Sequence, residues 1–523
     1  MDSFDIIVVG SGPGATFAAW GARGRRILML DVGFDPSDGP VLSGNPCELR
    51  AGGADLFPSL IGEGFEGLHN VFHSPVNLKL KAPGLSYVVR DWQRLTPIAG
   101  DNFAGAISLA RGGLANAWGA GVYRFTDRDL AGFPIAAADL RPYYDELTSH
   151  IGVSGANDDL EAHFECDDAL LPPLRLSDFF EEMLRRYQRH KLQFQREGVR
   201  LGRSRLAVLT KPHNGRAAYA YENLEFFRPH DPAIYNPAFT VDEMVRGGAV
   251  DYRPGRLVLR YRKLPNGIEV CARNLSTGDA ETFQGRALCL GAGALNSARI
   301  VLESHSDYTT ELPFFDNPMS CIPLFRLQRI GRALEPRDTS LASLNLVMDD
   351  PAGPAPLQAS LYGTTGPLRS DILFTLPFPF RASLAVTKYL APAMALLMLF
   401  YPGQPGSYVR LRPGGELEVS FAPEPPYGVE PRLIRLFRRL GYLTAEALVQ
   451  RPGMGAGLHY AGTLGMRANP GPYETDRNGK LTGTGRVYVV DGGAIPALPA
   501  KNLTFTIMAN ALRVGRQLAR DLS

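Results

Sequence analysis

The first 31 residues constrain the fold most, because they follow the pattern of a dinucleotide-binding βαβ unit. Residues 5–9 form an apolar run typical of a buried parallel strand, and a second such run covers residues 26–30. A glycine-rich turn lies between them, followed by a stretch, 16–23, that we expect to be helical. The pattern predicts an α/β chain that opens with a Rossmann-type nucleotide-binding domain.

The turn and the acid that follows it predict one end of a cofactor site. Gly10 permits a tight turn, Gly12 lets the backbone approach a pyrophosphate, and Ala15 keeps the helix close to the strand. The helix N-terminus favours phosphate, and an acid at the end of the second strand accepts hydrogen bonds from ribose hydroxyls. The residues expected to touch the cofactor here are Gly10, Ser11, Gly12, Pro13, Gly14, Ala15 and Asp31. This segment alone leaves open whether the dinucleotide is FAD or NAD.

Composition argues against several other classes of protein. The chain has 55 Lys and Arg against 53 Asp and Glu, a formal net charge of +2, which is too small for a dedicated nucleic-acid surface. The five cysteines are far apart and form no disulfide framework or zinc motif: Cys47, Cys166, Cys271, Cys289 and Cys321. His69 and His73 have i,i+4 spacing, but the glycines and prolines around them argue against a helix. We therefore expect no nucleic-acid partner and no metal site.

No targeting or membrane segment is expected. The N-terminal residues lack the basic and apolar regions of a secretory signal. The apolar stretch 390–401 is shorter than the roughly 20 residues that a spanning helix needs, and Pro392 interrupts it. We expect no transmembrane segment and a cytoplasmic location. Whether the apolar region 372–401 lines a pocket or touches a membrane surface is left open.

Later segments resemble the glucose–methanol–choline (GMC) oxidoreductase family. After the N-terminal turn, segments 111–119, 287–299, 459–466 and 489–507 are similar, in this order, to the family's flavin-contacting and closing motifs. The resemblance implies FAD as the cofactor. It also implies further FAD contacts from Arg111, Gly112, Gly113, Asn116, Ala117, Trp118, Gly119, Ala292, Gly293, Asp491, Gly492, Leu503 and Thr504.

Two departures from the family pattern bear on the chemistry. Some relatives attach the flavin covalently through a histidine in the first glycine-rich loop, but residues 98–140 contain neither histidine nor cysteine. We therefore expect noncovalent FAD. Many relatives also have clustered cysteines in the region matching 215–227, where this chain has Ala-Tyr-Ala-Tyr-Glu-Asn-Leu. The substrate side has therefore diverged.

The resemblance also implies the catalytic pair. Alcohol oxidation needs a base within hydrogen-bond reach of the hydroxyl, and the pKa of histidine lies near the operating pH. His459 lies in 453–465, a segment with five glycines that allow close approach to a flat cofactor. By the resemblance, His459 is the base and Asn502 is its polar partner on the substrate oxygen. Asn502 has a second interpretation as the N-cap of a helix expected at 504–518.

The expected fold class is α/β, with a Rossmann-type FAD-binding domain and a discontinuous α+β substrate-binding domain built on an antiparallel sheet. The FAD-binding domain takes residues 1–140, 240–305 and 455–523, and the substrate-binding domain takes 141–239 and 306–454. In the first we expect strands at 256–260, 267–270 and 287–290, with a hairpin at 265–267 and a loop, 51–84, over the flavin. In the second we expect strands at 396–401, 407–411 and 417–421 and helices at 176–190 and 430–448.

These features together predict an FAD-dependent oxidoreductase acting on the CH–OH group of a small-molecule alcohol, for example a sugar or a natural-product hydroxyl. Oxygen or an electron carrier would reoxidise the flavin. One alternative is a lyase of the same fold, similar to the hydroxynitrile lyases. Another is a flavin monooxygenase, which shares the N-terminal unit but is disfavoured by the motifs around His459 and Asn502.

Overall fold

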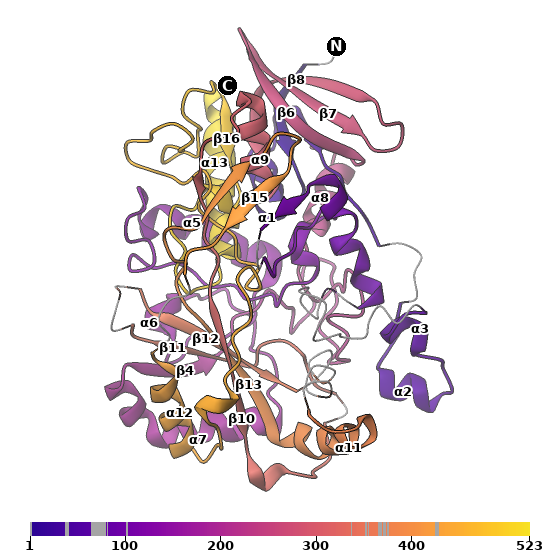
Figure 1. Ribbon diagram of the computed structural model, residues 1–523, viewed down its shortest axis with the longest axis vertical. Helices are drawn as coiled ribbons and strands as arrows, with labels where there is room; N and C mark the ends of the chain where they lie inside the picture. Colours follow the sequence, from indigo (N-terminus) through magenta and orange to yellow (C-terminus); the bar gives the residue numbers. More distant parts are fainter. Residues whose placement is uncertain are drawn as a thin grey trace.

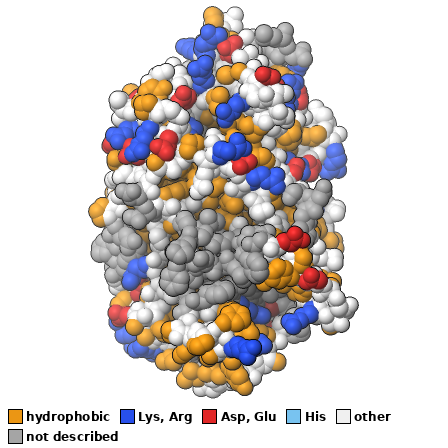
Figure 2. Space-filling model, turned by 45° about the vertical axis from the view of Figure 1, so that its right-hand side comes forward, with side chains coloured by type: hydrophobic (Ala, Val, Ile, Leu, Met, Phe, Trp, Pro, Cys, Tyr) orange, Lys and Arg blue, Asp and Glu red, His pale blue; other side chains and the backbone are white. Residues whose placement is uncertain are grey.

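The computed structural model describes residues 3–36, 41–63, 80, 82–100, 103–335, 337–350, 353, 355–364, 369, 373, 376–423 and 428–523. His69 and His73 lie outside these residues, as does much of the expected loop 51–84. Within the described chain no helix has the length and apolar character needed to cross a membrane. Figure 2 shows basic and acidic side chains intermixed over the upper part of one face, consistent with the balanced composition.

The upper half of the molecule is a seven-stranded sheet in the order β5-β2-β1-β8-β7-β6, with β16 also paired to β8 (Figure 1). Its strands are β1 (Ser3–Val9), β2 (Ile27–Leu30), β5 (Val250–Arg253), β6 (Arg256–Leu264), β7 (Gly267–Asn274), β8 (Ala280–Leu290) and β16 (Val487–Val489). The central strand β1 pairs in parallel with both β2 and β8. Burial on both faces explains the unbroken apolar runs of the first two strands. The β6–β7 hairpin forms where the sequence predicts it.

The first and last helices of the chain pack against each other on this sheet. They are α1 (Pro13–Gly21) and α13 (Thr504–Asp521), and they touch through glycines. A Cβ on Gly515 would lie 2.2 Å from the Ala18 carbonyl oxygen, so only glycine permits this approach. Helix α1 begins three residues before the predicted start because Pro13 occupies its first turn, where the missing N–H costs no hydrogen bond. The predicted C-terminal helix is confirmed.

The lower half contains a five-stranded antiparallel sheet in the order β10-β13-β12-β11-β4. The strands are β4 (Val199–Arg203), β10 (Met319–Phe325), β11 (Leu344–Met348), β12 (Leu357–Gly363) and β13 (Met394–Phe400). One face buries apolar residues in a second core with α7 (Asp178–Arg196) and α12 (Glu430–Arg439). Helix α7 runs six residues past its predicted end. The predicted helix 430–448 is wrong beyond Arg439, because Gly441 adopts a φ of +82° and stops the helix.

The predicted strands 407–411 and 417–421 form, but in a separate four-stranded sheet and not in the five-stranded sheet. They are β14 (Tyr408–Leu411) and β15 (Leu417–Ser420), which pair with β9 (Leu312–Pro313) and β3 (Ile98–Ala99). Their buried side chains belong to the first hydrophobic core, which also contains the buried residues of β1, β2, β8, α1 and α13. Alternation in the sequence predicts a hairpin correctly but does not identify the surface that its apolar face covers.

The segment 141–239 contributes to both cores. Tyr187 and Leu201 belong to the second, whereas Leu206 and Tyr235 belong to the first. The remaining α-helices are α2 (Pro46–Ala51), α3 (Phe57–Leu60), α4 (Trp92–Leu95), α5 (Ala137–Leu147), α6 (Glu161–Phe164), α8 (Pro237–Arg246), α9 (Ala294–His305) and α11 (Phe380–Leu390). The two halves are therefore interleaved in sequence and meet along a shared surface.

Gly14 and Gly12 give a test of this packing. A Cβ on Gly14 would lie 2.1 Å from the Val490 carbonyl oxygen, whereas one on Gly12 would meet no atom within 4 Å. We expect Gly14→Ala to lower the free energy of unfolding by about 1–3 kcal/mol or more. Gly12→Ala is the matched control and should leave the stability of flavin-free protein nearly unchanged. Thermal unfolding of both variants checks this, and equal unfolding temperatures would contradict the packing.

Candidate functional site

A cavity of about 750 Å³ extends from the N-terminal turn to the five-stranded sheet. Most of the predicted site residues line it: Gly10, Ser11, Gly12, Pro13, Gly14, Asp31, Gly113, Ala117, Trp118, Gly119, Ala292, Gly293, His459, Asp491, Gly492, Asn502, Leu503 and Thr504. Four others lie behind the wall: Ala15, Arg111, Gly112 and Asn116. The cavity therefore brings together segments that are nearly 500 residues apart.

The N-terminal end of the cavity has the form of a phosphate-binding cradle. Gly12 precedes the first turn of α1, and the space that a side chain on it would fill is open. Gly10 has a φ of +90°, and a Cβ there would lie 2.6 Å from the Gly291 carbonyl oxygen. Gly113, from the second glycine-rich segment, approaches the Gly12 backbone. Open space at a helix N-terminus suits a pyrophosphate, so these residues fit the dinucleotide that the sequence predicts.

Asp31 lies in the wall of the cavity just after β2. Its carboxylate accepts hydrogen bonds from the Ser11 hydroxyl and from the Tyr252 hydroxyl, the latter at 3.1 Å. Burial raises the pKa of Asp31 to about 7. The Ser11 oxygen in turn accepts from the backbone N–H of Gly112 at 3.0 Å. Asp31 thus ties the first turn to the second glycine-rich segment, and Tyr252 is a partner that the sequence pattern did not reveal.

Asn116 shapes the second glycine-rich segment from behind. Its amide nitrogen donates to the carbonyl oxygens of Arg111 at 2.9 Å and Gly113 at 2.7 Å. Its amide oxygen accepts from the Tyr87 hydroxyl at 2.8 Å and the Asn236 amide at 2.6 Å. The Arg111 guanidinium forms salt bridges with two aspartates and does not line the cavity. Both residues therefore hold the loop rather than face the cavity.

Asp491 joins two other segments of the wall. Its carboxylate accepts from the Gly293 N–H at 2.9 Å, the Ser297 hydroxyl at 2.5 Å and the Gly493 N–H at 2.8 Å. Burial raises the pKa of Asp491 to about 6. The carboxylate thus fixes the turn after β8 against the turn after β16.

His459 is held in one tautomer by Asn317. The Asn317 amide nitrogen donates to the carbonyl oxygens of Tyr401 at 2.7 Å and Pro499 at 3.0 Å. The amide oxygen is therefore the atom that meets His459 Nδ1, at 2.9 Å. Because that oxygen only accepts, Nδ1 carries the proton and Nε2 carries the lone pair of the neutral ring.

The lone pair of His459 Nε2 is directed toward Asn502. The Asn502 amide nitrogen lies 3.2 Å from it, and both residues line the cavity. The Asn502 amide oxygen is buried and makes no hydrogen bond to any described residue. The predicted capping role of Asn502 is wrong, since Leu503 occupies the cap position of α13 without a side-chain bond. The Asn502 side chain contacts His459 through its amide nitrogen and does not cap the helix.

Asp316 holds the loop that carries His459 in place through hydrogen bonds to its backbone. Its carboxylate accepts from the backbone N–H of Gly455 at 2.7 Å and of His459 at 3.4 Å, and burial raises its pKa to about 7. A Cβ on Gly457 would lie 2.9 Å from the Asn317 carbonyl oxygen, so glycine is needed there. The sequence interpretation missed both Asp316 and Asn317. The available signal was an isolated polar pair between two apolar runs.

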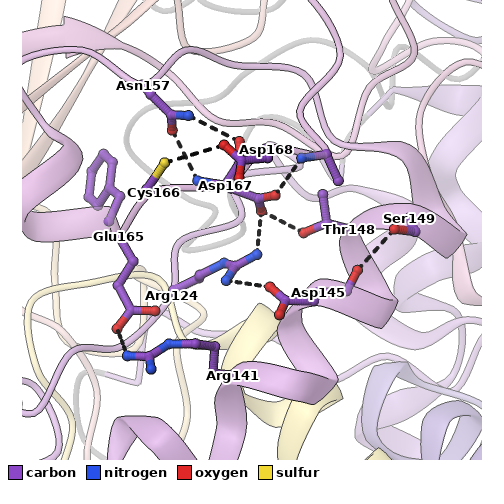
Figure 3. Close-up of polar contacts among 12 residues, drawn as sticks. Arg124, Arg141, Asp145, Thr148, Ser149, Asn157, Glu165, Cys166, Asp167 and Asp168 are labelled. Atoms are coloured by element: carbon purple, nitrogen blue, oxygen red, sulfur yellow. Dashed lines mark hydrogen bonds and ion pairs between the residues drawn. The ribbon is translucent and has the colours of Figure 1, made fainter.

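The residue before Asn502 anchors the other half of the pair. Lys501 is buried, and its ammonium group bonds to Asp129 at 2.5 Å and to two backbone carbonyls, one of them that of Arg124 at 3.1 Å. Figure 3 shows the Arg124 guanidinium bound in turn to Asp167, at 2.5 Å. These buried charged side chains thus fix the backbone position of Lys501 and, with it, that of the adjacent Asn502.

The far wall of the cavity is formed by side chains of the five-stranded sheet and by Tyr123, which packs against that sheet. It mixes apolar and hydroxyl-bearing side chains: Tyr123, Met319, Ser360, Tyr362, Met398 and Phe400. The Phe400 ring lies 5.2 Å from the His459 ring, between centroids. Behind the wall, the buried Asn345 amide donates to the Tyr123 hydroxyl at 2.5 Å and accepts from Ser360 at 3.1 Å. This wall suits a small molecule with both apolar and hydroxyl groups.

No group of three or more histidine, cysteine, aspartate or glutamate side chains able to hold a metal ion occurs in the described part of the chain.

The raised pKa of Asp31 predicts that the difference in unfolding free energy between the unmodified protein and Asp31→Asn depends on pH. A carboxyl whose pKa is higher in the folded state stabilises the fold at low pH, and that contribution is lost as pH rises toward 7. The carboxamide that Asp31→Asn introduces resembles the protonated acid and does not titrate. From pH 5.5 to 7.5 we expect flavin-free Asp31→Asn to gain about 1–2 kcal/mol of unfolding free energy relative to the unmodified protein. Thermal or urea unfolding at the two pH values measures this. A difference that does not change with pH would contradict it.

Comparisons with known proteins agree with the fold and with the C-terminal motifs. Residues 441–511 match the family model of GMC oxidoreductase. The whole chain superposes on a pyridoxine 4-oxidase from Mesorbium loti at 14% identity and a TM-score of 0.58, over 98% of this chain and 99% of that one. It also superposes on a formate oxidase from Aspergillus oryzae RIB40, studied for FAD modification, at 11% identity and a TM-score of 0.60, over 100% and 99% of the two chains. No curated protein sequence matches the chain. The chain therefore has the GMC oxidoreductase fold along its length, and the resemblance to the GMC oxidoreductase family is confirmed by the segment that carries His459 and Asn502.

Proposed function

We propose that this protein is an FAD-dependent oxidoreductase that oxidises the CH–OH group of a small alcohol, with His459 as the base. The observation that carries the proposal is the position of His459, whose Nδ1 lies 2.9 Å from the Asn317 amide oxygen and whose Nε2 faces the cavity 3.2 Å from the Asn502 amide nitrogen. The pyridoxine 4-oxidase and formate oxidase that share the fold support an oxidase class. Oxygen or an electron carrier would be the final acceptor, and we place the protein in the cytoplasm.

The cavity has the groups needed to hold FAD. The α1 N-terminus and Gly12 would receive the pyrophosphate, and Asp31 the ribose hydroxyls. At the other end Thr504 begins α13 and lines the cavity, so the positive end of that helix dipole is directed into it. Bound there, FAD would supply the hydride acceptor, and the dipole favours the negative charge that arrives with the hydride.

His459 and Asn502 would act on the substrate oxygen together. The hydroxyl donates to His459 Nε2 and accepts from the Asn502 amide nitrogen, replacing the contact that the two side chains make with each other. As the hydride leaves the carbinol carbon, the hydroxyl proton moves to Nε2. The resulting imidazolium keeps its Nδ1–H on Asn317, whose oxygen then faces a full positive charge. Asn317 is thus a positioning residue that also stabilises the protonated base.

Replacing His459 tests the base directly. A panel of alcohols and sugars, scored anaerobically by flavin absorbance, first identifies a substrate. We expect His459→Ala to keep its fold and FAD and to reduce flavin about 10²–10⁴ times more slowly with that substrate. Asn502→Ala is the matched control and should slow the same step less, because it orients the oxygen without taking the proton. Rapid-mixing absorbance measures both rates.

Two outcomes would count against this function. Near wild-type flavin reduction by His459→Ala would exclude the histidine as the base. Turnover of a cyanohydrin with no anaerobic flavin bleaching would favour the lyase of the same fold.

The flavin is expected to be noncovalent. Neither histidine nor cysteine occurs in 98–140, and among the described residues that line the cavity His459 is the one histidine and no cysteine is present. Acid precipitation of the purified protein should therefore release the yellow chromophore into the supernatant. A yellow pellet would contradict this expectation.

A further inference from the structure

One end of the molecule exposes a cluster of large apolar side chains, which we call the end patch. Six of the twelve large hydrophobic residues that are exposed in the described chain belong to it: Leu327, Ile330, Leu334, Phe378, Phe380 and Tyr389. Phe380 is 59% exposed and Tyr389 is 63% exposed. In Figure 2 hydrophobic side chains gather at the lower end of the face, with Lys and Arg side chains beside them. Helix α11 lies at this end in Figure 1.

The end patch comes from two segments that are bonded to each other. The Gly331 N–H donates to the Tyr389 carbonyl at 3.0 Å, and the Arg326 N–H donates to the Ala393 carbonyl at 2.7 Å. The 3₁₀ turns η5 (Leu327–Arg329) and η6 (Ala391–Ala393) are in contact. The Tyr389 end of α11 and the segment around Gly331 therefore lie side by side.

Helix α11 differs from an ordinary surface helix, which buries its apolar stripe, because its apolar residues Leu384, Val386 and Leu390 are only half-buried. The residues that it buries are Ser383 and Thr387, one turn apart, whereas Phe380 and Tyr389 face solvent. The Ser383 hydroxyl donates to the Phe378 carbonyl at 3.0 Å, which fixes the start of the helix.

The exposed charges without an ion pair among the described residues of these two segments are basic. Arg332, Arg381 and Lys388 are exposed and form no ion pair with a described residue. Residues 376–401 contain no aspartate or glutamate. The acid that follows the first segment, Glu335, is half-buried and accepts from the Asp178 N–H at 2.8 Å. Aromatic side chains among unpaired cations are the composition of a helix that lies in the headgroup region of an anionic bilayer.

We infer that the end patch docks on the surface of a membrane that contains anionic lipids. At 11 residues α11 is too short to cross a bilayer, which takes about 20 residues. A symmetric contact with a second copy is disfavoured, because it would bring the same three cations against one another. This inference does not rest on the proposed reaction, since it concerns a surface outside the cavity.

Vesicle flotation of the flavin-loaded protein tests the inference. We expect the protein to float with vesicles of phosphatidylcholine and phosphatidylglycerol. With vesicles of phosphatidylcholine alone it should remain unbound in the bottom fraction. The triple variant Phe378→Ser, Phe380→Ser and Tyr389→Ser should bind the anionic vesicles at least about tenfold more weakly. Val245→Ser, an exposed apolar residue on α8, is the matched control and should bind like the unmodified protein.

A charge series separates the cations from the aromatic residues. Arg332→Gln, Arg381→Gln and Lys388→Gln together should weaken binding about tenfold or more and reduce its sensitivity to salt, with Arg260→Gln as the matched control. Thermal unfolding confirms that each variant is folded. Absence of binding to anionic vesicles would overturn the inference, as would equal binding by the triple serine variant. If the unmodified protein is a dimer in solution and the triple serine variant is a monomer, the end patch is instead a contact between two copies of the chain.

Discussion

The hydrogen bond between the Asn317 amide oxygen and His459 Nδ1 is the interaction on which the site depends. Asn317 lies between β9 and β10, and its amide nitrogen reaches a carbonyl after β13 and another just before Asn502. One side chain therefore connects the five-stranded sheet, the loop that carries His459 and the segment before α13. A net hydrogen bond is worth about 1 kcal/mol, but an unsatisfied buried partner costs about 1–3 kcal/mol. The network is consequently more sensitive to loss of one member than its separate bonds suggest.

Close backbone approach is the second requirement of the architecture. Gly14 lies against the strand-end backbone at Val490, and Gly515 lies against Ala18 where α13 crosses α1. These contacts bring the N-terminal turn and the start of α13 to the same cavity from opposite ends of the chain. Buried carboxylates then join the loops that the glycines bring together, as Asp31 and Asp491 do. The cavity is thus formed by loops whose backbones are held by hydrogen bonds to these carboxylates, that of Asp31 acting through the Ser11 hydroxyl.

Much of this arrangement could be predicted from local sequence. The βαβ unit, the β6–β7 hairpin and helix α13 follow from periodicity and turn residues, which depend on neighbours in the chain. The sheet that β14 joins depends on tertiary packing, and the end of α12 at Arg439 depends on Gly441, a local signal that the prediction of helix 430–448 overlooked. Asn317 was missed because a lone Asp-Asn pair has no pattern until the fold brings it to His459, 142 residues away. Asn502 lines the cavity as predicted, but it does not cap α13, because its amide nitrogen contacts His459.

The most direct test of the account is the protonation state of the His459 ring. Protein labelled with ¹⁵N in the histidine rings would be examined by NMR at neutral pH, with His459→Gln used to assign the signals. We predict a protonated Nδ1 and an unprotonated Nε2 in the unmodified protein, and loss of this single tautomer in Asn317→Ala. A protonated Nε2 in the neutral ring of the unmodified protein would contradict the account, because that atom could not then accept the proton of a bound alcohol.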